Sequence, residues 1–373
     1  MKLTFLLLIV CNLFFVSAFS QPKKYKTIQR VIDKATQGHI PGVMIYIKTP
    51  RHGEWTGASG LADVERATRM DKDYVFAVGS IGKTYNAVAA MKLVEAGKFQ
   101  LDDLISKYLP DEIVSNIPNG KLITVRHLLG NTSGIYNYEF DSTLNQLYFN
   151  GKLKLDTLSH MNVLRRYVYG KPSTGAPGTH FSYSSTNFML VAMIMDSVCP
   201  DGHTDFLQKN VIEANGFTST FYRSTPQRLV NHYGDLNKDG VLENLTAMTI
   251  ETTNWFIGDD GIYATITDAA HFLESLMKAD LVSKPSLEQM TTWNDPKKPD
   301  YGLGLMADKS FPYKFLIGHS GRGIGMTTDL FYFPHQNMTV GIFSNVGVRG
   351  SSKQIRKDYF RMRSRIVKKL FIF

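Results

Sequence analysis

The chain has 373 residues, 43% of them hydrophobic and 20% charged, which are the proportions of a globular protein with one large or two ordinary domains. Its 42 Lys and Arg residues outnumber its 33 Asp and Glu residues and give a net charge of +9. Apart from a cluster in the C-terminal tail, the basic residues are spread along the chain. The charge therefore suits an envelope surface or an anionic polymer and does not indicate nucleic acid as a partner.

The first twenty residues predict export. An apolar stretch covers residues 3–19, and Val16-Ser-Ala18 and Ala18-Phe-Ser20 both offer small-residue cleavage sites. We therefore predict a signal peptide over 1–20, an exported protein that is periplasmic or secreted further, and no stable membrane anchor after cleavage. An uncleaved anchor is the weaker alternative, because the stretch is short for a membrane-spanning helix. Cleavage leaves Cys199 alone, which excludes an intramolecular disulfide and a cysteine-based metal site.

The part of the chain that follows reads as a helix, a hairpin and a second helix. Val88, Met91 and Val94 give the second helix an apolar stripe, and Gly97 stands where a left-handed cap would end it. The expected elements are a helix over 25–37, strands over 43–48, 54–62 and 74–78, and a helix that begins at Ser80.

The middle of the chain is expected to be mostly helical. Asp235-Leu-Asn-Lys-Asp-Gly240 resembles the start of a calcium loop, but Thr246 occupies the position of the closing acidic residue. A hairpin turn with Asp239-Gly240 at its tip is the preferred interpretation. The expected elements are short helices over 101–110 and 124–130, an amphipathic helical region over 137–168, a Pro/Gly-rich loop over 172–178 and an apolar helix over 188–198.

From Gly258 onward the pattern changes to successive strands. Their order indicates an antiparallel meander rather than alternating βαβ units. The final helix is basic and is expected to cover the core, with membrane-surface binding as a weaker alternative. The expected elements are a strand over 259–265, a helix over 267–278 capped by Thr267, strands over 301–306, 315–318, 327–333 and 338–344, and a helix over 353–369.

Ser80 and Lys83 stand one helical turn apart, so their side chains share a face and can meet. A neutral lysine at that spacing can take the proton of a serine hydroxyl and make it a nucleophile. A capping serine with a solvated lysine is the commonplace alternative. The sharper rival is a degenerate phosphate loop over 77–84 with Asp196 as its magnesium ligand. Export away from ATP and the helical setting of Asp196 disfavour that rival.

Three short segments stand out, and they follow one another along the chain in this order: Ser80-Ile-Gly-Lys83, Tyr183-Ser184-Ser185 and His319-Ser320-Gly321. At this point the chain resembles the penicillin-recognising serine hydrolases, which comprise class C β-lactamases, D-Ala-D-Ala carboxypeptidases, D-amino-acid amidases and related esterases. The resemblance covers essentially the whole mature chain. Further matching segments are Phe76-Ala-Val-Gly-Ser80, Leu128-Leu-Gly-Asn-Thr-Ser-Gly134, Pro177-Gly-Thr-His-Phe-Ser-Tyr183 and Tyr301-Gly-Leu-Gly304.

The resemblance implies an acyl-enzyme mechanism. Ser80 would attack a carbonyl, and Lys83 and Tyr183 would share the proton transfers. The backbone N–H groups of Ser80 and Arg322 would form the oxyanion hole. No metal or cofactor is implied, and the partner would be a small-molecule or peptide substrate, with peptidoglycan-derived peptides among the candidates. The implied substrate-binding residues are Ser185, His319, Ser320, Gly321 and Arg322.

The chain departs from the family pattern at two positions. Ser185 stands where the second motif usually ends in Asn, whose side chain helps hold the lysine and the substrate amide. His319 stands where dedicated β-lactamases usually carry Lys, and a neutral histidine attracts a substrate carboxylate less strongly. The Ser185 departure counts against amide or β-lactam recognition and favours a simpler ester. The His319 pattern is more typical of carboxypeptidases, D-aminopeptidases and esterases than of dedicated β-lactamases. Arg322 could restore positive charge if its side chain faces the cleft.

The implied fold is α+β with three layers, an antiparallel sheet built from both chain ends and flanked by helices. A mostly helical lobe at about residues 85–245 is inserted into a single catalytic domain over 21–373. The expected function is an exported serine hydrolase that cleaves an amide, peptide or ester bond. A class C-type β-lactamase is the alternative enzyme. A catalytically weak module that binds peptidoglycan or penicillin is the alternative from another class.

Overall fold

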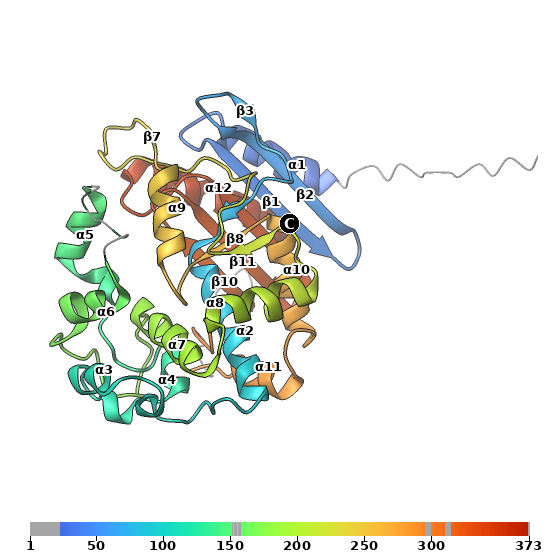
Figure 1. The fold of residues 1–373 in the computed structure, drawn as a ribbon. Coiled ribbons are helices and arrows are strands. Elements are labelled where there is room, and N and C mark those ends of the chain that lie inside the picture. Colours follow the sequence, from blue (N-terminus) through green and yellow to red (C-terminus); the bar gives the residue numbers. More distant parts are fainter. Residues whose placement is uncertain are drawn as a thin grey trace, which may run out of the picture.

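The computed structural model describes residues 23–150, 152, 155, 158–294, 300–309 and 315–371, so the signal peptide predicted over 1–20 lies outside the described residues. A sheet runs through the molecule, with helices on both faces and a further group of helices set to one side (Figure 1). Along these ranges, no helix combines the length and apolar character that crossing a bilayer requires.

The central sheet is antiparallel and is built from both ends of the chain. Its strands lie in the order β3-β2-β1-β12-β11-β10-β9, so that β1 (Gly42–Thr49) pairs with β12 (Met338–Ser344) in the middle. The structure confirms the predicted α+β fold, with the strands over 327–333 and 338–344 at their expected bounds. The other strands of this sheet are β2 (Gly53–Asp63), β3 (Thr68–Arg69), β9 (Met306–Asp308), β10 (Leu316–Arg322) and β11 (Thr327–Phe333).

Both faces of the sheet are covered by helices. Successive residues of a strand point to opposite faces, and in β1 Ile45 and Ile47 pack under α1 and α12. Met44 and Tyr46 belong instead to the larger core that contains α2 and α10. Burial on both faces explains why β1 is a continuous apolar run and not an alternating one. The four helices are α1 (Lys23–Ala35), α12 (Lys353–Phe371), α2 (Gly82–Glu95) and α10 (Ile266–Met277).

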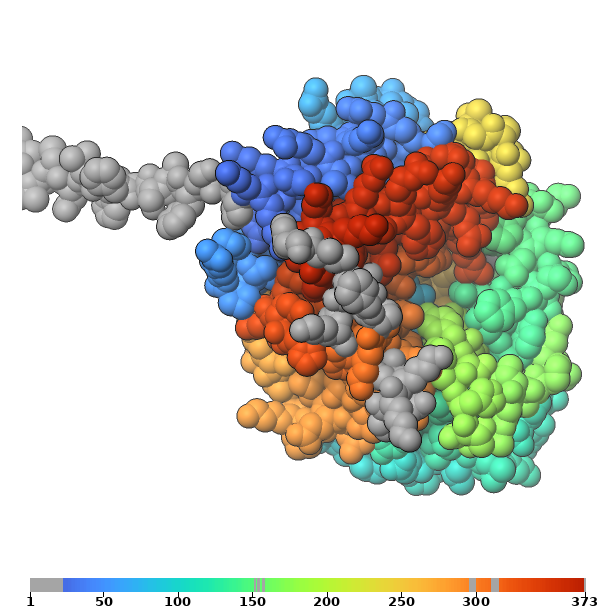
Figure 2. Space-filling view, turned by 180° about the vertical axis from the view of Figure 1, so that it is seen from behind, coloured from blue at the N-terminus to red at the C-terminus, as the bar shows by residue number. Residues whose placement is uncertain are grey.

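The first and last helices lie side by side on the outer surface (Figure 2). Lys24 Nζ donates a hydrogen bond to Leu370 O at 2.8 Å, which joins the start of α1 to the end of α12. Just beyond α1, His39 contacts Asp358 of α12 at 2.9 Å, so the two helices run antiparallel. The expectation that the last helix covers the core is confirmed by its buried residues, which are Ile355, Tyr359, Met362, Ile366 and Leu370.

Between α2 and β8 the chain is mostly helical, and these helices lie to one side of the central sheet (Figure 1). The hairpin predicted around Asp239-Gly240 forms from β6 (Tyr233–Gly234) and β7 (Glu243–Asn244). The remaining helices are α3 (Asp111–Asn116), α4 (Val125–Leu129), α5 (Ser142–Phe149), α6 (His160–Val163), α7 (Ser185–Val198), α8 (Gly202–Leu207), α9 (Thr246–Trp255) and α11 (Lys284–Met290). A three-stranded sheet joins β4 (Phe76–Ala77), β8 (Ile262–Ala264) and β5 (Thr220–Tyr222).

Two of the expected helices are wrong in extent. Over 101–110 only the 3₁₀ turn Ile105–Lys107 forms, because this backbone bonds to a distant segment; Arg126 N donates to Leu101 O at 2.7 Å. The region over 137–168 is broken into α5, α6 and a π turn over Leu164–Val168. Amphipathic patterning could not reveal these interruptions, since it records which face is buried and not where the helix bends.

Local turn chemistry corrects two further expectations. Thr265, and not Thr267, caps α10, because Thr265 Oγ1 accepts a hydrogen bond from Asp268 N at 3.2 Å. The strand expected over 301–306 begins only at Met306, because Gly304 has φ 71° and turns the chain before it. The turn brings Tyr301 close to β10, where it becomes part of the site described below.

The second helix is buried more completely than its apolar stripe predicted. Every residue of α2 from Gly82 to Met91 is buried, because the helix runs between the central sheet and the group of helices beside it. Val94, expected in the stripe, is only partly buried. Gly97 has φ 68° and provides the expected left-handed end. The burial includes Lys83, whose side chain is 0% exposed.

Candidate active site

A cavity of about 440 Å³ opens beside the start of α2, and five of the predicted site residues line it. Three other predicted residues, Lys83, Ser185 and Gly321, are buried and are not part of the lining. Among the described residues, no group of three or more acidic, histidine or cysteine side chains could hold a metal ion. The five lining residues are Ser80, Tyr183, His319, Ser320 and Arg322.

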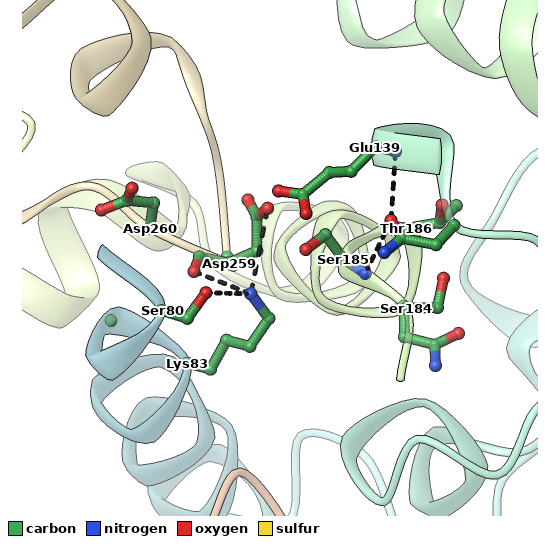
Figure 3. Close-up of polar contacts among 12 residues, drawn as sticks. Ser80, Lys83, Glu139, Ser184, Ser185, Thr186, Asp259 and Asp260 are labelled. Atoms are coloured by element: carbon green, nitrogen blue, oxygen red, sulfur yellow. Dashed lines mark hydrogen bonds and ion pairs between the residues drawn. The ribbon is translucent and has the colours of Figure 1, made fainter. Parts of the chain in front are cut away.

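Ser80 and Lys83 meet at the entrance to α2 (Figure 3). Ser80 lies in the 3₁₀ turn Gly79–Ile81, which leads directly into the α-helix. Lys83 Nζ donates a hydrogen bond to Ser80 Oγ at 3.1 Å, as the spacing of one helical turn requires. Gly79 has φ 60°, and a Cβ there would lie 3.1 Å from Gly321 Cα. The turn therefore needs glycine to place Ser80 against β10.

Asp259 completes the surroundings of Lys83, although it is not among the site residues predicted from the sequence. Lys83 Nζ donates a hydrogen bond to Asp259 O at 3.0 Å and lies 4.0 Å from Asp259 Oδ2. Tyr138 Oη donates to the same Oδ2 at 2.8 Å. Burial raises the pKa of Asp259 to about 6, against the opposing charge of Lys83. Two acidic residues between glycines, Gly258 and Gly261, were the available signal in the sequence.

The neighbouring carboxyl, Asp260, lines the cavity and points away from Lys83 (Figure 3). Burial, followed by the charge of Asp259, raises the pKa of Asp260 to about 8. Its loop lies directly on α2, because a Cβ at Gly82 would come within 2.8 Å of Asp260 O. The absence of that Cβ lets the two acidic residues approach the start of the helix.

Tyr183 reaches the cavity from the loop before α7. The ammonium of Lys83 lies 5.1 Å from the centroid of the Tyr183 ring, close enough for a cation–π contact. The ring also meets Tyr301 edge to face, with centroids 6.0 Å apart. Burial raises the pKa of the Tyr183 phenol above its ordinary value, with the Ser80 hydroxyl opposing the shift. The phenol is therefore neutral at physiological pH.

His319 is also neutral. Its ring is 2% exposed, and burial followed by the charge of Lys83 lowers its pKa to about 3. Nδ1 lies 2.8 Å from Ser320 O and must donate to that carbonyl, so Nε2 accepts from Tyr301 Oη at 3.1 Å. Tyr301 thus belongs to the site by contact, although in the sequence it stands out only as part of a matching segment.

The strand that carries His319 is open on one side over its second half. β9 pairs with β10 only through residues 316–318, and no further strand in the described part of the chain lies beside residues 319–322 on that side. Gly321 is required for packing, since a Cβ there would lie 2.1 Å from Val78 O. The absence of a side chain lets the segment before Ser80 approach β10 closely. The role that the resemblance implies for Gly321, letting the substrate approach the backbone, stays a prediction.

The Arg322 guanidinium is not a free cation in the cleft, because it is paired with other residues of the chain. Its guanidinium donates to Asp329 Oδ1 at 2.6 Å and to Thr328 O at 2.6 Å. Asp329 is 3% exposed, and its other carboxylate oxygen pairs with Arg363 Nε at 3.0 Å. The expectation that Arg322 restores positive charge to the site is therefore not met by this arrangement.

Ser185 is the first residue of α7, and its hydroxyl has no hydrogen-bond partner among the described residues. It lies close enough to Asp259 to lower the pKa of that carboxyl (Figure 3). Asn187 does not replace the missing amide. Its side chain bonds to Ser133 Oγ at 2.6 Å and to Asn131 Oδ1 at 2.9 Å, which fixes the segment before α5 instead.

Comparisons with known proteins identify a matching family and similar proteins. A family model described as Beta-lactamase matches residues 28–359. The chain is 22% identical to Protein flp of Staphylococcus aureus (strain N315) over 325 residues, which cover 86% of this chain and 62% of that protein. It is 24% identical to Penicillin-binding protein 4* of Bacillus subtilis (strain 168) over 304 residues, 77% of this chain and 64% of the other. The chain thus spans less than two thirds of the length of these curated relatives.

Two solved structures share the fold at low sequence identity. A D-stereospecific amidohydrolase from Streptomyces sp. superposes with a TM-score of 0.76 at 24% identity, covering 90% of this chain and 98% of that one. A D-amino acid amidase from Ochrobactrum anthropi SV3, complexed with L-phenylalanine amide, superposes with a TM-score of 0.75 at 19% identity, covering 93% and 99%. At these identities the similarity establishes the fold alone.

Proposed function

The chain belongs to the beta-lactamase family, and from that membership we propose that it is a serine hydrolase that cleaves an amide bond through an acyl-enzyme on Ser80. The observation that carries the proposal is the 3.1 Å contact between Lys83 Nζ and Ser80 Oγ at a cavity of about 440 Å³. A serine hydroxyl becomes a useful nucleophile only when a base of this kind can accept its proton.

In the proposed acylation, Ser80 Oγ attacks the substrate carbonyl carbon while its proton passes to the neutral amine of Lys83. The resulting oxyanion accepts hydrogen bonds from the backbone N–H groups of Ser80 and Arg322. Arg322 N lies 3.5 Å from the point that a Cβ of Gly79 would occupy, which supports its place beside the nucleophile. Collapse expels the amine, which takes its proton from Lys83 or the neutral phenol of Tyr183.

Deacylation repeats these steps with water in place of the serine hydroxyl. Water attacks the ester carbonyl, and its proton moves through Tyr183 and Lys83 back to Ser80 Oγ as the acid leaves. Tyr183 is suited to hand on a proton because it is neutral and lies against both groups. The same steps would cleave an ester, since only the leaving group differs.

The charges of the cavity favour an acyl group without a carboxylate close to the scissile bond. The two arginines that line it are both paired with carboxylates, Arg322 with Asp329 at 2.6 Å and Arg349 with Glu139 at 3.2 Å. His319 is neutral. The lining is otherwise rich in apolar and aromatic side chains, including Phe140, Tyr148, Phe181, Phe256, Met306 and Ile324. We therefore favour a hydrophobic amino-acid amide or small peptide over a penicillin.

The test uses a serine-reactive fluorophosphonate and a substrate panel. Wild-type protein should gain one covalent adduct by intact mass, and Ser80→Ala should gain none. Among D- and L-phenylalanine amides, an N-acyl-D-Ala-D-Ala peptide and a penicillin, we expect an amide to be turned over fastest. Faster turnover of the penicillin would favour the β-lactamase alternative. A wild-type protein that forms no adduct would leave the binding-module alternative.

Export is a separate proposal that rests on the apolar stretch over 3–19. Expression of the full chain with a C-terminal tag, followed by fractionation and N-terminal sequencing, tests it. We expect the mature protein outside the cytoplasm with a new N-terminus near residue 21. A cytoplasmic product that still carries Met1 would contradict the proposal.

A further inference from the structure

We infer that Asp259 is the positioning residue that holds Lys83 on Ser80, an inference that rests on the function proposed above. Lys83 Nζ has three oxygen contacts among the described residues, and two of them come from Asp259. They are its carbonyl at 3.0 Å and its carboxylate at 4.0 Å, beside Ser80 Oγ at 3.1 Å. A long, flexible lysine side chain would otherwise lose this orientation, since only directed contacts fix its amine.

The chain is shaped to bring Asp259 to this place. Gly258 has φ 77°, and a Cβ there would lie 1.9 Å from Phe188 O in α7. A Cβ at Gly82 would lie 2.8 Å from Asp260 O in the same loop. Two side-chain-free positions therefore let the loop press between α2 and α7, which points the carbonyl and the carboxylate of Asp259 at Lys83.

The Asp259 carboxylate is itself held in place by a second residue besides Lys83. Tyr138, which is 1% exposed, donates its hydroxyl to Asp259 Oδ2 at 2.8 Å. The other oxygen, Oδ1, has no hydrogen-bond partner among the described residues, and neither has the nearby Ser185 Oγ. Tyr138 therefore orients the Asp259 carboxylate, which the short Ser185 side chain does not do. Asp259 in turn holds Lys83 in place from a different segment of the chain.

A purely structural role is the competing explanation, because a buried lysine needs a counter-charge wherever it lies. The two roles differ in what they do to the reaction. A positioning carboxylate sets the labelling rate of the folded protein, so its removal should lower the plateau rate of Ser80 labelling, and an amide placed at position 185 should restore part of that rate. A carboxylate that only stabilises the fold would change the unfolding temperature and leave the labelling rate of the folded protein unchanged.

The experiment measures fluorophosphonate labelling of Ser80 against pH for wild type and for Asp259→Asn, a substitution that keeps the shape of the side chain. We expect the plateau rate to fall by about 100-fold, the size of effect that misplacing a reacting group produces. The double variant Ser185→Asn/Asp259→Asn should recover part of the rate, because an amide at 185 extends toward Lys83 from the other side.

A matched control exists elsewhere in the chain. Glu274 is a buried carboxylate that also pairs with a lysine and a tyrosine, Lys48 at 2.6 Å and Tyr46 at 3.1 Å, but it does not line the cavity. Glu274→Gln should lower stability without changing the labelling rate of the folded protein or its pH profile. Tyr138→Phe, which leaves every contact of Lys83 in place, provides a milder second variant and should slow labelling by about tenfold through loss of one hydrogen bond.

An unchanged plateau rate in Asp259→Asn, or a reduced rate that Ser185→Asn does not partly restore, overturns the inference. If Asp259→Asn does not fold, Tyr138→Phe becomes the deciding variant. An unchanged labelling rate in Tyr138→Phe would then overturn the inference. A wild-type protein that is not labelled at all overturns the proposed function first, and the two failures are thereby distinguished.

Discussion

The guanidinium of Arg322 donates to Asp329 Oδ1 at 2.6 Å, and this contact decides how much positive charge the cavity presents. Asp329 also accepts from Tyr359 of α12 at 2.8 Å, so Arg322 is held toward the helical layer that covers the sheet. The cavity is left with a neutral histidine on the wall where a substrate carboxylate would need a cation.

A lysine in place of His319 should therefore change substrate preference. We predict that His319→Lys raises kcat/KM for an N-acyl-D-Ala-D-Ala peptide relative to phenylalanine amide by about tenfold, because one charged hydrogen bond contributes about 1.5 kcal/mol. Initial rates with both substrates measure the ratio. His319→Gln, which adds no charge, is the control. An unchanged ratio in His319→Lys would mean that the strand edge does not receive the carboxylate.

Tyr183→Phe should separate the two halves of the reaction. Removal of the phenol should slow turnover of an activated ester by about 10²-fold or more, the usual contribution of a proton-transfer group. The labelling of Ser80 should fall less, since the Lys83–Ser80 contact remains. A burst of product followed by slow turnover would show this directly. Equal losses in burst and steady state would contradict a special role in deacylation.

Asp260→Asn should stabilise the protein in a pH-dependent way. The folded carboxyl has its pKa raised from 3.8 to about 8, so it keeps its proton over a range in which the unfolded chain has lost it. Ionisation therefore favours the unfolded state as the pH rises from 4 to 8. Thermal unfolding at pH 4, 6 and 8 should show wild type and variant converging at pH 4 and separating toward pH 8. A separation that stays constant with pH would contradict the raised pKa.

Gly82→Ala should push the acidic loop off α2. The new Cβ would lie 2.8 Å from Asp260 O, a backbone atom that cannot move alone, so we expect a loss of about 1–3 kcal/mol in the free energy of unfolding. The higher helix propensity of alanine offsets at most about 1 kcal/mol of this. Urea unfolding measures the effect. Gly38→Ala, whose Cβ has only an ordinary contact at 3.6 Å, should be nearly neutral. Equal stability of the two variants would count against the clash.

Part of the fold could be predicted because several strands carry their own local signal. The strands over 327–333 and 338–344 are apolar runs bounded by turn residues, and they form at those bounds. The prediction of a helix over 101–110 is wrong because the backbone of this segment bonds to the distant residue 126, and no local sequence pattern records such a contact. Tertiary contacts also bury α2 beyond the single stripe that its sequence suggests.

The residues of the site likewise divide into those that could be predicted from the sequence and those that could not. Ser80 and Lys83 meet because they are one turn apart on a single helix, which sequence spacing can express. Asp259 reaches Lys83 across the fold from the loop before β8, and only the glycines beside it hinted at a special backbone. The pairing of Arg322 with Asp329 was likewise invisible, because it depends on two adjacent strands in register.

The central pairing of β1 with β12 has a consequence for when this protein can act. Until its last strands are made, a nascent chain contributes only β1, β2 and the two-residue β3 to this half of the central sheet, and so short a sheet is marginal in water without neighbours. Closing a sheet between the two ends of the chain is also slow, since the longest loop must be ordered before its contacts form. The wall that β10 provides against Ser80 therefore cannot form until β11 and β12 have been synthesised. Until that late stage Ser80 and Lys83 lack one side of the site in which they are proposed to act.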